Sequence, residues 1–112
     1  MNFQKIFGNA GESLAEKFLQ EKGLIILARN FHTREGEVDL VCQEGDLIVF
    51  VEVKARRSQK FGSAIEAVDE RKLQKVVAAG ETWLVKNFRH HAEWRMDVVA
   101  IQNGKIEWIK GV

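Results

Sequence analysis

Apolar residues recur along the chain in two patterns, one typical of helices and the other of strands. Near the N-terminus the spacing is helical, at Leu14, Ala15, Phe18 and Leu19. Asn9 is the predicted N-cap of this helix, with Glu12 as its capping-box partner and Gly23 as its stop. A second helix is predicted to begin at Asp69, with an apolar side formed by Leu73, Val76, Val77, Gly80 and Leu84.

The other apolar stretches are strand-like runs separated by turns. Residues 24–30, 37–42 and 47–54 form the first three runs, and the third has the strongest strand pattern in the chain. Gly45 and Asp46 predict a hairpin between the second and third runs, as Asn103 and Gly104 do between residues 95–101 and 105–109. The predicted order of elements is α-β-β-β-α-β-β, in one domain that spans residues 1–112.

The turn at Gly45 fixes the register of the first hairpin. With Glu44 paired to Leu47, Asp39 lies opposite Glu52 and Glu37 lies opposite Lys54, all on one face. Val38 and Leu40 then share the other face with Val49, Val51 and Val53. Opposed side chains in a sheet have Cβ atoms about 5 Å apart, where two carboxylates repel by about 3 kcal/mol at an effective dielectric of about 20. A cation must therefore offset the Asp39–Glu52 pair.

A divalent metal ion is the cation that offsets such a pair best. The available donors are oxygens of Asp39, Glu52 and a backbone carbonyl near Val53, and they favour Mg²⁺ or Mn²⁺ over zinc. The histidines and Cys42 lack a zinc-ligand spacing. Lys54 can orient a water molecule or balance the charge of a phosphate that the metal polarises. Glu37 is open to three interpretations: a metal ligand, a residue supporting the ligands, or an ion-pair partner of Lys54.

The composition limits the class of protein and the compartment in which this chemistry is expected. Apolar residues make up 46% of the chain and charged residues 29%, which excludes general disorder. Cys42 is the single cysteine and cannot form an internal disulfide, as expected in a reducing compartment. The longest apolar run, Leu24 to Ala28, is far short of a membrane span. We therefore expect a soluble cytoplasmic protein with no membrane partner.

Basic residues gather after the third strand. The stretch from Lys54 to Lys75 holds seven basic residues and three acidic ones, which is compatible with a ligand that carries phosphate. Charge runs are more often simply solvated faces. Arg56 is the first candidate for a phosphate contact, because it shares the face of Glu52 and Lys54. The full set of candidates is Arg29, Arg34, Arg56, Arg57, Lys60 and Lys72.

The same residues resemble a known family. Asp39 and, thirteen residues later, the triplet Glu52-Val53-Lys54 resemble the D…E-x-K signature of the PD-(D/E)xK nuclease superfamily. The wider pattern resembles the bacterial YraN family of predicted endonucleases, which are similar to archaeal Holliday-junction resolvases. The matching stretches lie between about residue 8 and residue 101, and include Gly11-Glu12, residues 28–30, 36–41 and 49–54, Lys72-Leu73 and residues 95–101.

The resemblance implies a restriction-endonuclease-like fold of the α/β class, with a mixed sheet of about five strands flanked by helices. It also implies Mg²⁺ or Mn²⁺ at Asp39 and Glu52, and Lys54 as the catalytic lysine. Glu12 matches the helical acidic residue that joins the metal site in such nucleases, so it is open to two interpretations, metal ligand and helix cap. Resemblance to the resolvases further suggests a homodimer and branched DNA.

Two functional hypotheses follow. The first is a Mg²⁺-dependent endodeoxyribonuclease that hydrolyses phosphodiester bonds in DNA, including branched or structured DNA, through Asp39, Glu52, Lys54 and Glu12. The second is a non-catalytic nucleic-acid-binding or partner-docking domain on the same fold. RNA is a third candidate substrate, because no residue of the sequence discriminates against it. Metal binding and metal-dependent cleavage separate the first hypothesis from the second.

Overall fold

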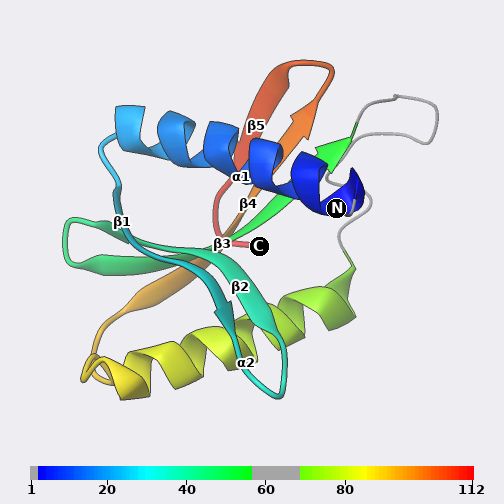
Figure 1. Cartoon of the computed structure of the whole chain (residues 1–112). Helices are drawn as coiled ribbons and strands as arrows, with labels where there is room; N and C mark the ends of the chain where they lie inside the picture. The colour runs from blue at the N-terminus through cyan, green and yellow to red at the C-terminus, as the bar shows by residue number, and fades with distance from the viewer. Residues whose placement is uncertain (1–2, 57–68) are drawn as a thin grey trace.

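The computed structural model describes residues 3–56 and 69–112 (Figure 1). The elements are α1 (Phe3–Glu21), β1 (Ile25–His32), β2 (Glu37–Glu44), β3 (Leu47–Arg56), α2 (Glu70–Lys86), β4 (Trp94–Gln102) and β5 (Lys105–Ile109). The order α-β-β-β-α-β-β is therefore confirmed. So is the predicted N-cap of the second helix, because the side chain of Asp69 accepts a hydrogen bond from the backbone N–H of Lys72 at 2.7 Å.

The five strands form one mixed sheet in the order β1-β2-β3-β4-β5. Strands β3 and β4 are parallel, and the other neighbouring strands are antiparallel. Parallel neighbours need a crossover connection, which contains α2. Figure 1 shows α1 and α2 on opposite sides of the sheet. This arrangement agrees with the restriction-endonuclease-like fold that the resemblance implies.

Two apolar clusters hold the layers together, one under each helix. Ala15 and Leu19 of α1 pack on the face that carries Val49 and Val51. On the other face, the α2 residues Val76, Ala79 and Trp83 pack on Ile48 and Phe50. Strand β3 is thus covered on both sides, which explains why its sequence is almost continuously apolar.

Helix α1 starts earlier than its sequence pattern predicts. It begins at Phe3, so Asn9 lies inside the helix and the predicted capping box is wrong. Asn in a helix interior costs less than about 1 kcal/mol, and each added residue gains a backbone hydrogen bond. Leu14 is also 52% exposed, outside the buried stripe. Within the described residues no helix, α1 included, is long and apolar enough to cross a membrane.

Two glycines allow the helices to approach one end of the sheet closely. A Cβ atom at Gly11 would lie 3.0 Å from the Cβ of Ala55 on β3. A Cβ at Gly36 would lie 2.7 Å from the backbone oxygen of Lys75 on α2. The space at both positions is taken by neighbouring atoms, so a larger residue would push helix and sheet apart. The two contacts place Glu12 and Glu37 at the same end of the sheet.

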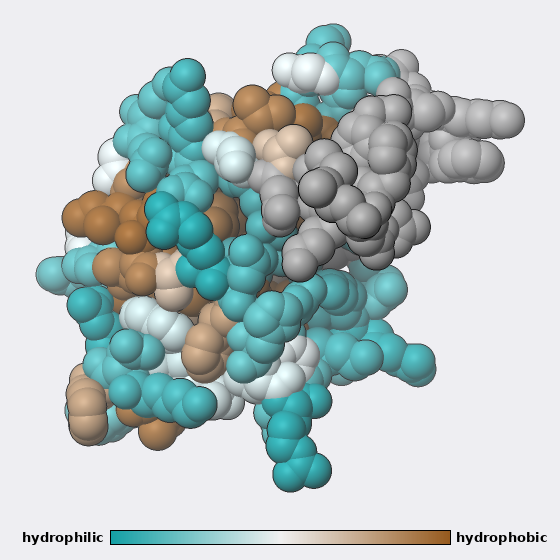
Figure 2. Space-filling view, viewed as in Figure 1, coloured by the Kyte–Doolittle hydropathy of each residue, from teal (hydrophilic) through white to brown (hydrophobic). Residues whose placement is uncertain are grey.

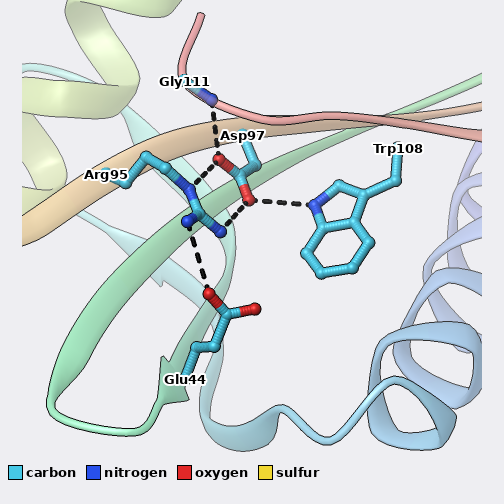
Figure 3. A network of polar contacts seen from close by, with 5 residues as sticks. All are labelled: Glu44, Arg95, Asp97, Trp108 and Gly111. Carbon is cyan, nitrogen blue, oxygen red and sulfur yellow. Dashed lines mark hydrogen bonds and ion pairs between the residues drawn. The ribbon is translucent and has the colours of Figure 1, made fainter.

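A buried ion pair ties β4 to β5 and to the C-terminal residues (Figure 3). Asp97 is fully buried and accepts two hydrogen bonds from the guanidinium of Arg95, at 2.7 and 2.8 Å. Its oxygens also accept the indole N–H of Trp108 at 2.9 Å and the backbone N–H of Gly111 at 3.0 Å. Arg95 reaches Glu44 on β2 at 3.3 Å as well. The charge of Asp97 is therefore fully partnered inside the protein.

Candidate metal centre

Strands β2 and β3 stop pairing where the acidic residues begin. Their ladder has the register predicted from the turn, from Glu44–Leu47 to Leu40–Val51. Beyond this point β2 stays paired with β1, and β3 stays paired with β4. Oδ2 of Asp39 accepts a hydrogen bond from the backbone N–H of Val53 at 2.8 Å. The carboxylate of Asp39 thus bonds to a β3 backbone group that has no β2 backbone partner.

The side-chain alternation of β1 and β2 breaks at the same level of the sheet. Val38 packs in the cluster under α2, whereas Leu40 packs in the cluster under α1. The prediction that these two residues share a face is therefore wrong. On β1 the break coincides with Asn30, which has a left-handed φ of 50°, a conformation that asparagine tolerates better than most residues. Asn30 is a site residue that the sequence analysis missed.

Asp39 and Glu52 meet as a buried pair, as the register predicts. The two residues are only 7% and 5% exposed, and their carboxyl groups interact. Burial, followed by the hydrogen bond and negative charge of Asp39, raises the pKa of Glu52 to about 9. The other oxygen of Glu52, Oε2, is buried without a hydrogen-bond partner. At neutral pH the pair therefore holds a proton, and one acceptor oxygen is left unsatisfied.

Two lysines from different elements act on this pair. Lys72, in the first turn of α2, and Lys54, two residues beyond Glu52 on β3, both lower the pKa of Glu52 through their charge. The effect of Lys72 is the larger. Lys54 thus lies near the carboxylates as predicted, and Lys72 is a second cation beside them.

Glu12 reaches the same centre from α1. Burial and the charge of Asp39 raise the pKa of Glu12, while a hydrogen bond with the side chain of Asn30 lowers it. Since α1 begins at Phe3, Glu12 is not a capping residue, and its electrostatic neighbour is Asp39. In residues 3–56 and 69–112, however, no three His, Cys, Asp or Glu side chains are already arranged to hold a metal. Glu12 is a neighbour of the pair rather than a preformed third ligand.

Glu37 has ionic partners that the hairpin register did not predict. Its Oε2 lies 2.9 Å from Nδ1 of His32 on β1, and its Oε1 lies 4.0 Å from Nζ of Lys72 on α2. Among the described residues these are its ion-pair partners, so the predicted pair with Lys54 is wrong. The ladder between β2 and β3 ends before it reaches Glu37, which removes the expected opposition of the two residues. His32, which lacks a zinc-ligand spacing, is thus a neighbour of Glu37 at this centre.

The other predicted phosphate contacts are scattered. Arg29 faces α1, where its guanidinium pairs with Glu16, with 2.8 Å between Nε and Oε2. It borders a shallow hollow of about 200 Å³, together with Glu12 and Asn30. Arg34 is exposed in the turn after β1, and Arg56 is the last residue of β3. Arg57 and Lys60 lie outside the described residues. Figure 2 shows hydrophilic side chains mixed with apolar ones on the face between α1 and α2.

The donor set at this centre fits a small divalent cation. Carboxylate oxygens are the ligands that Mg²⁺ and Mn²⁺ prefer. The unpartnered Oε2 of Glu52 is a free acceptor, and the N–H of Val53 orients the carboxylate of Asp39. A cation at the pair would replace the proton of Glu52 and remove the repulsion between two buried anions. Asp39 and Glu52 are therefore the residues of this centre best able to hold a metal.

The raised pKa of Glu52 gives a prediction for the metal-free protein. Between its ordinary value of 4.5 and about 9, the folded state holds a proton that the unfolded state has released. Stability from this group is therefore lost as pH rises. From about pH 5 to about pH 8 we expect the wild type to lose about 4 kcal/mol relative to Glu52→Gln. Urea unfolding in EDTA measures this difference, with Glu81→Gln as the exposed control; parallel pH profiles of wild type and Glu52→Gln would contradict it.

Comparison with known proteins identifies the family of this chain. The family model described as "Uncharacterised protein family UPF0102" matches residues 11–101. A UPF0102 protein of Syntrophomonas wolfei is 52% identical over 97 residues, covering 85% of this chain and 84% of its own. One of Vibrio campbellii is 45% identical over 107 residues, covering 92% and 88%. The chain therefore belongs to the UPF0102 family, the YraN family that its motifs resemble.

Proposed function

We propose that this protein is a metal-dependent endonuclease that hydrolyses phosphodiester bonds in DNA, branched or structured DNA included. The observation that carries the proposal is the buried pair of Asp39 and Glu52, in which Oε2 of Glu52 has no partner. Two carboxylates in contact inside a protein oppose folding unless a proton or a cation stands between them. A sheet gains no stability from this arrangement, so a function explains it better.

Each residue of the centre has a role in this reaction. Asp39 and Glu52 would hold Mg²⁺ or Mn²⁺, and Glu12 would join them when the metal draws its carboxylate in. The metal, when bound, neutralises charge on the phosphate and polarises its oxygens. Lys54 positions the attacking water molecule and balances the charge that develops on the phosphate. Basic residues nearby hold the phosphate backbone, so specificity follows the shape of the DNA more than its base sequence.

Calorimetric titration with Mn²⁺ tests the metal centre without relying on activity. We expect the wild type to bind Mn²⁺, and both Asp39→Asn and Glu52→Gln to lose that binding, because each removes an anionic oxygen. Asp46→Asn and Glu81→Gln are matched controls, since both residues are exposed and lie outside the centre. Binding that all four variants retain, or a wild type that binds no Mn²⁺, would contradict the proposed centre.

A non-catalytic nucleic-acid-binding domain is the second candidate. It is favoured by one observation, the lack of three converging metal-ligating side chains within the described residues. Such a domain would bind DNA or RNA with an affinity that falls as salt rises, and would cleave neither in Mg²⁺ or Mn²⁺.

The proposed nuclease acts in the cytoplasm as a homodimer. A dimer suits resolvase-like substrates, because such substrates have two related strands to cut.

A further inference from the structure

Glu37 lies between the side chains of His32 and Lys72 at the edge of the candidate metal centre. One of its carboxylate oxygens faces His32 on β1, at 2.9 Å, and the other faces Lys72 on α2, at 4.0 Å. The close approach of Gly36 to the backbone of Lys75 fixes the distance between this part of β2 and α2. Glu37 therefore holds together side chains from three elements of the fold.

His32 and Lys72 keep polar groups that Glu37 does not contact. His32 contacts Glu37 through Nδ1, so Nε2, on the opposite side of the ring, is directed away from the carboxylate, and the side chain is 68% exposed. The ammonium of Lys72 has three donors, only a loose contact with Glu37, and a side chain that is 38% exposed. An ion pair between exposed groups contributes little to stability, so the contacts of Glu37 with His32 and Lys72 add little to the free energy of folding.

Lys72 also connects this group to the metal centre. Its charge acts on Glu52 more strongly than that of Lys54 does. The nearby acid Asp69 is already engaged, since its side chain caps α2 through the backbone N–H of Lys72. Arg29, which faces α1, pairs with Glu16 through two nitrogens of its guanidinium. Lys72, on the side of α2, therefore keeps donors for an anion.

We propose that His32 and Lys72, held in place by Glu37, form the phosphate-binding edge of the centre. This inference rests on the proposed function, because it takes a nucleic-acid strand as the ligand. The backbone phosphates of that strand contact Nζ of Lys72 and Nε2 of His32 as the strand approaches Asp39 and Glu52. Such contacts hold any sequence, since phosphates carry no base identity. Glu37 is a positioning residue, and Arg29 is not part of this edge.

The binding of a fluorescent DNA duplex, measured by anisotropy in EDTA, tests the edge in the absence of cleavage. One lost phosphate contact lowers the salt slope by about 0.9, which corresponds to about eight-fold weaker binding at about 0.1 M salt. We expect that loss for Lys72→Gln and for His32→Gln. We expect His32→Arg to restore binding. Lys86→Gln, at the far end of α2, is the control and should change affinity less than two-fold.

Glu37→Gln separates positioning from simple charge. Removal of a negative charge should strengthen binding to DNA if Glu37 acts through charge alone. The proposed edge predicts weaker binding instead, because His32 and Lys72 lose the group that holds them. Tighter binding by Glu37→Gln, or wild-type affinity in both Lys72→Gln and His32→Gln, would overturn the inference and leave the proposed nuclease function standing. A wild type that binds no nucleic acid would overturn both.

Discussion

Asp39→Ala and Lys54→Ala are each expected to lower Mg²⁺-dependent cleavage of DNA by a factor of about 10² to 10⁴. The two losses have different causes. Asp39 supplies an anionic ligand and is fixed by the N–H of Val53, so its removal should abolish Mn²⁺ binding as well. Lys54 is no metal ligand, so Lys54→Ala should keep Mn²⁺ binding and lose only the rate. Labelled linear, flapped and four-way DNA, each with Mg²⁺ or Mn²⁺, provide the assay.

A matched control makes this result interpretable. Lys105 is an exposed lysine at the turn between β4 and β5, so Lys105→Ala should cleave at the wild-type rate. Preference for the four-way substrate over linear DNA would support the branched substrate that the resolvase resemblance suggests. Equal cleavage by wild type, Asp39→Ala and Lys54→Ala would point to a contaminating nuclease and end the catalytic claim.

Asp97→Ala is expected to have the largest effect on stability, with a loss of about 3–5 kcal/mol in the free energy of unfolding. The substitution leaves the guanidinium of Arg95 half-buried without its main partner. It also removes the acceptor of the indole N–H of Trp108 and of the backbone N–H of Gly111 (Figure 3). A loss of that size is comparable to the total stability of many small domains, so urea unfolding should show a large shift.

Asp97→Asn tests the same network in case Asp97→Ala does not fold. The amide keeps the shape and one acceptor oxygen but removes the charge that Arg95 pairs with, so we expect a smaller loss of about 2–3 kcal/mol. Asp46→Ala, at the exposed turn after β2, is the control and should change stability by less than about 0.5 kcal/mol. A loss below about 1 kcal/mol in both Asp97 variants would show that the ion pair contributes little to the fold.

The part of this protein that the sequence determines by itself is local. The two-residue turn at Gly45 sets the register of β2 against β3, and the ladder has that register as far as Leu40–Val51. The apolar periods likewise predict the order of all seven elements. The same register, continued one step beyond the last ladder pair, predicts that Asp39 and Glu52 are neighbours, as the structure has them.

The tertiary structure decides which side chains face each other where the helices pack on the sheet. The left-handed Asn30 and the separation of β2 from β3 move Val38 to the face opposite Leu40, which no alternating pattern can express. Helix α2 supplies Lys72 to Glu37 and α1 supplies Glu16 to Arg29, across the packing interfaces of the sheet. Such partners depend on how closely each helix approaches, which Gly11 and Gly36 permit. The local periodicity of the sequence contains no information about the distance between helix and sheet. These ion-pair partners are therefore seen only in the packed fold.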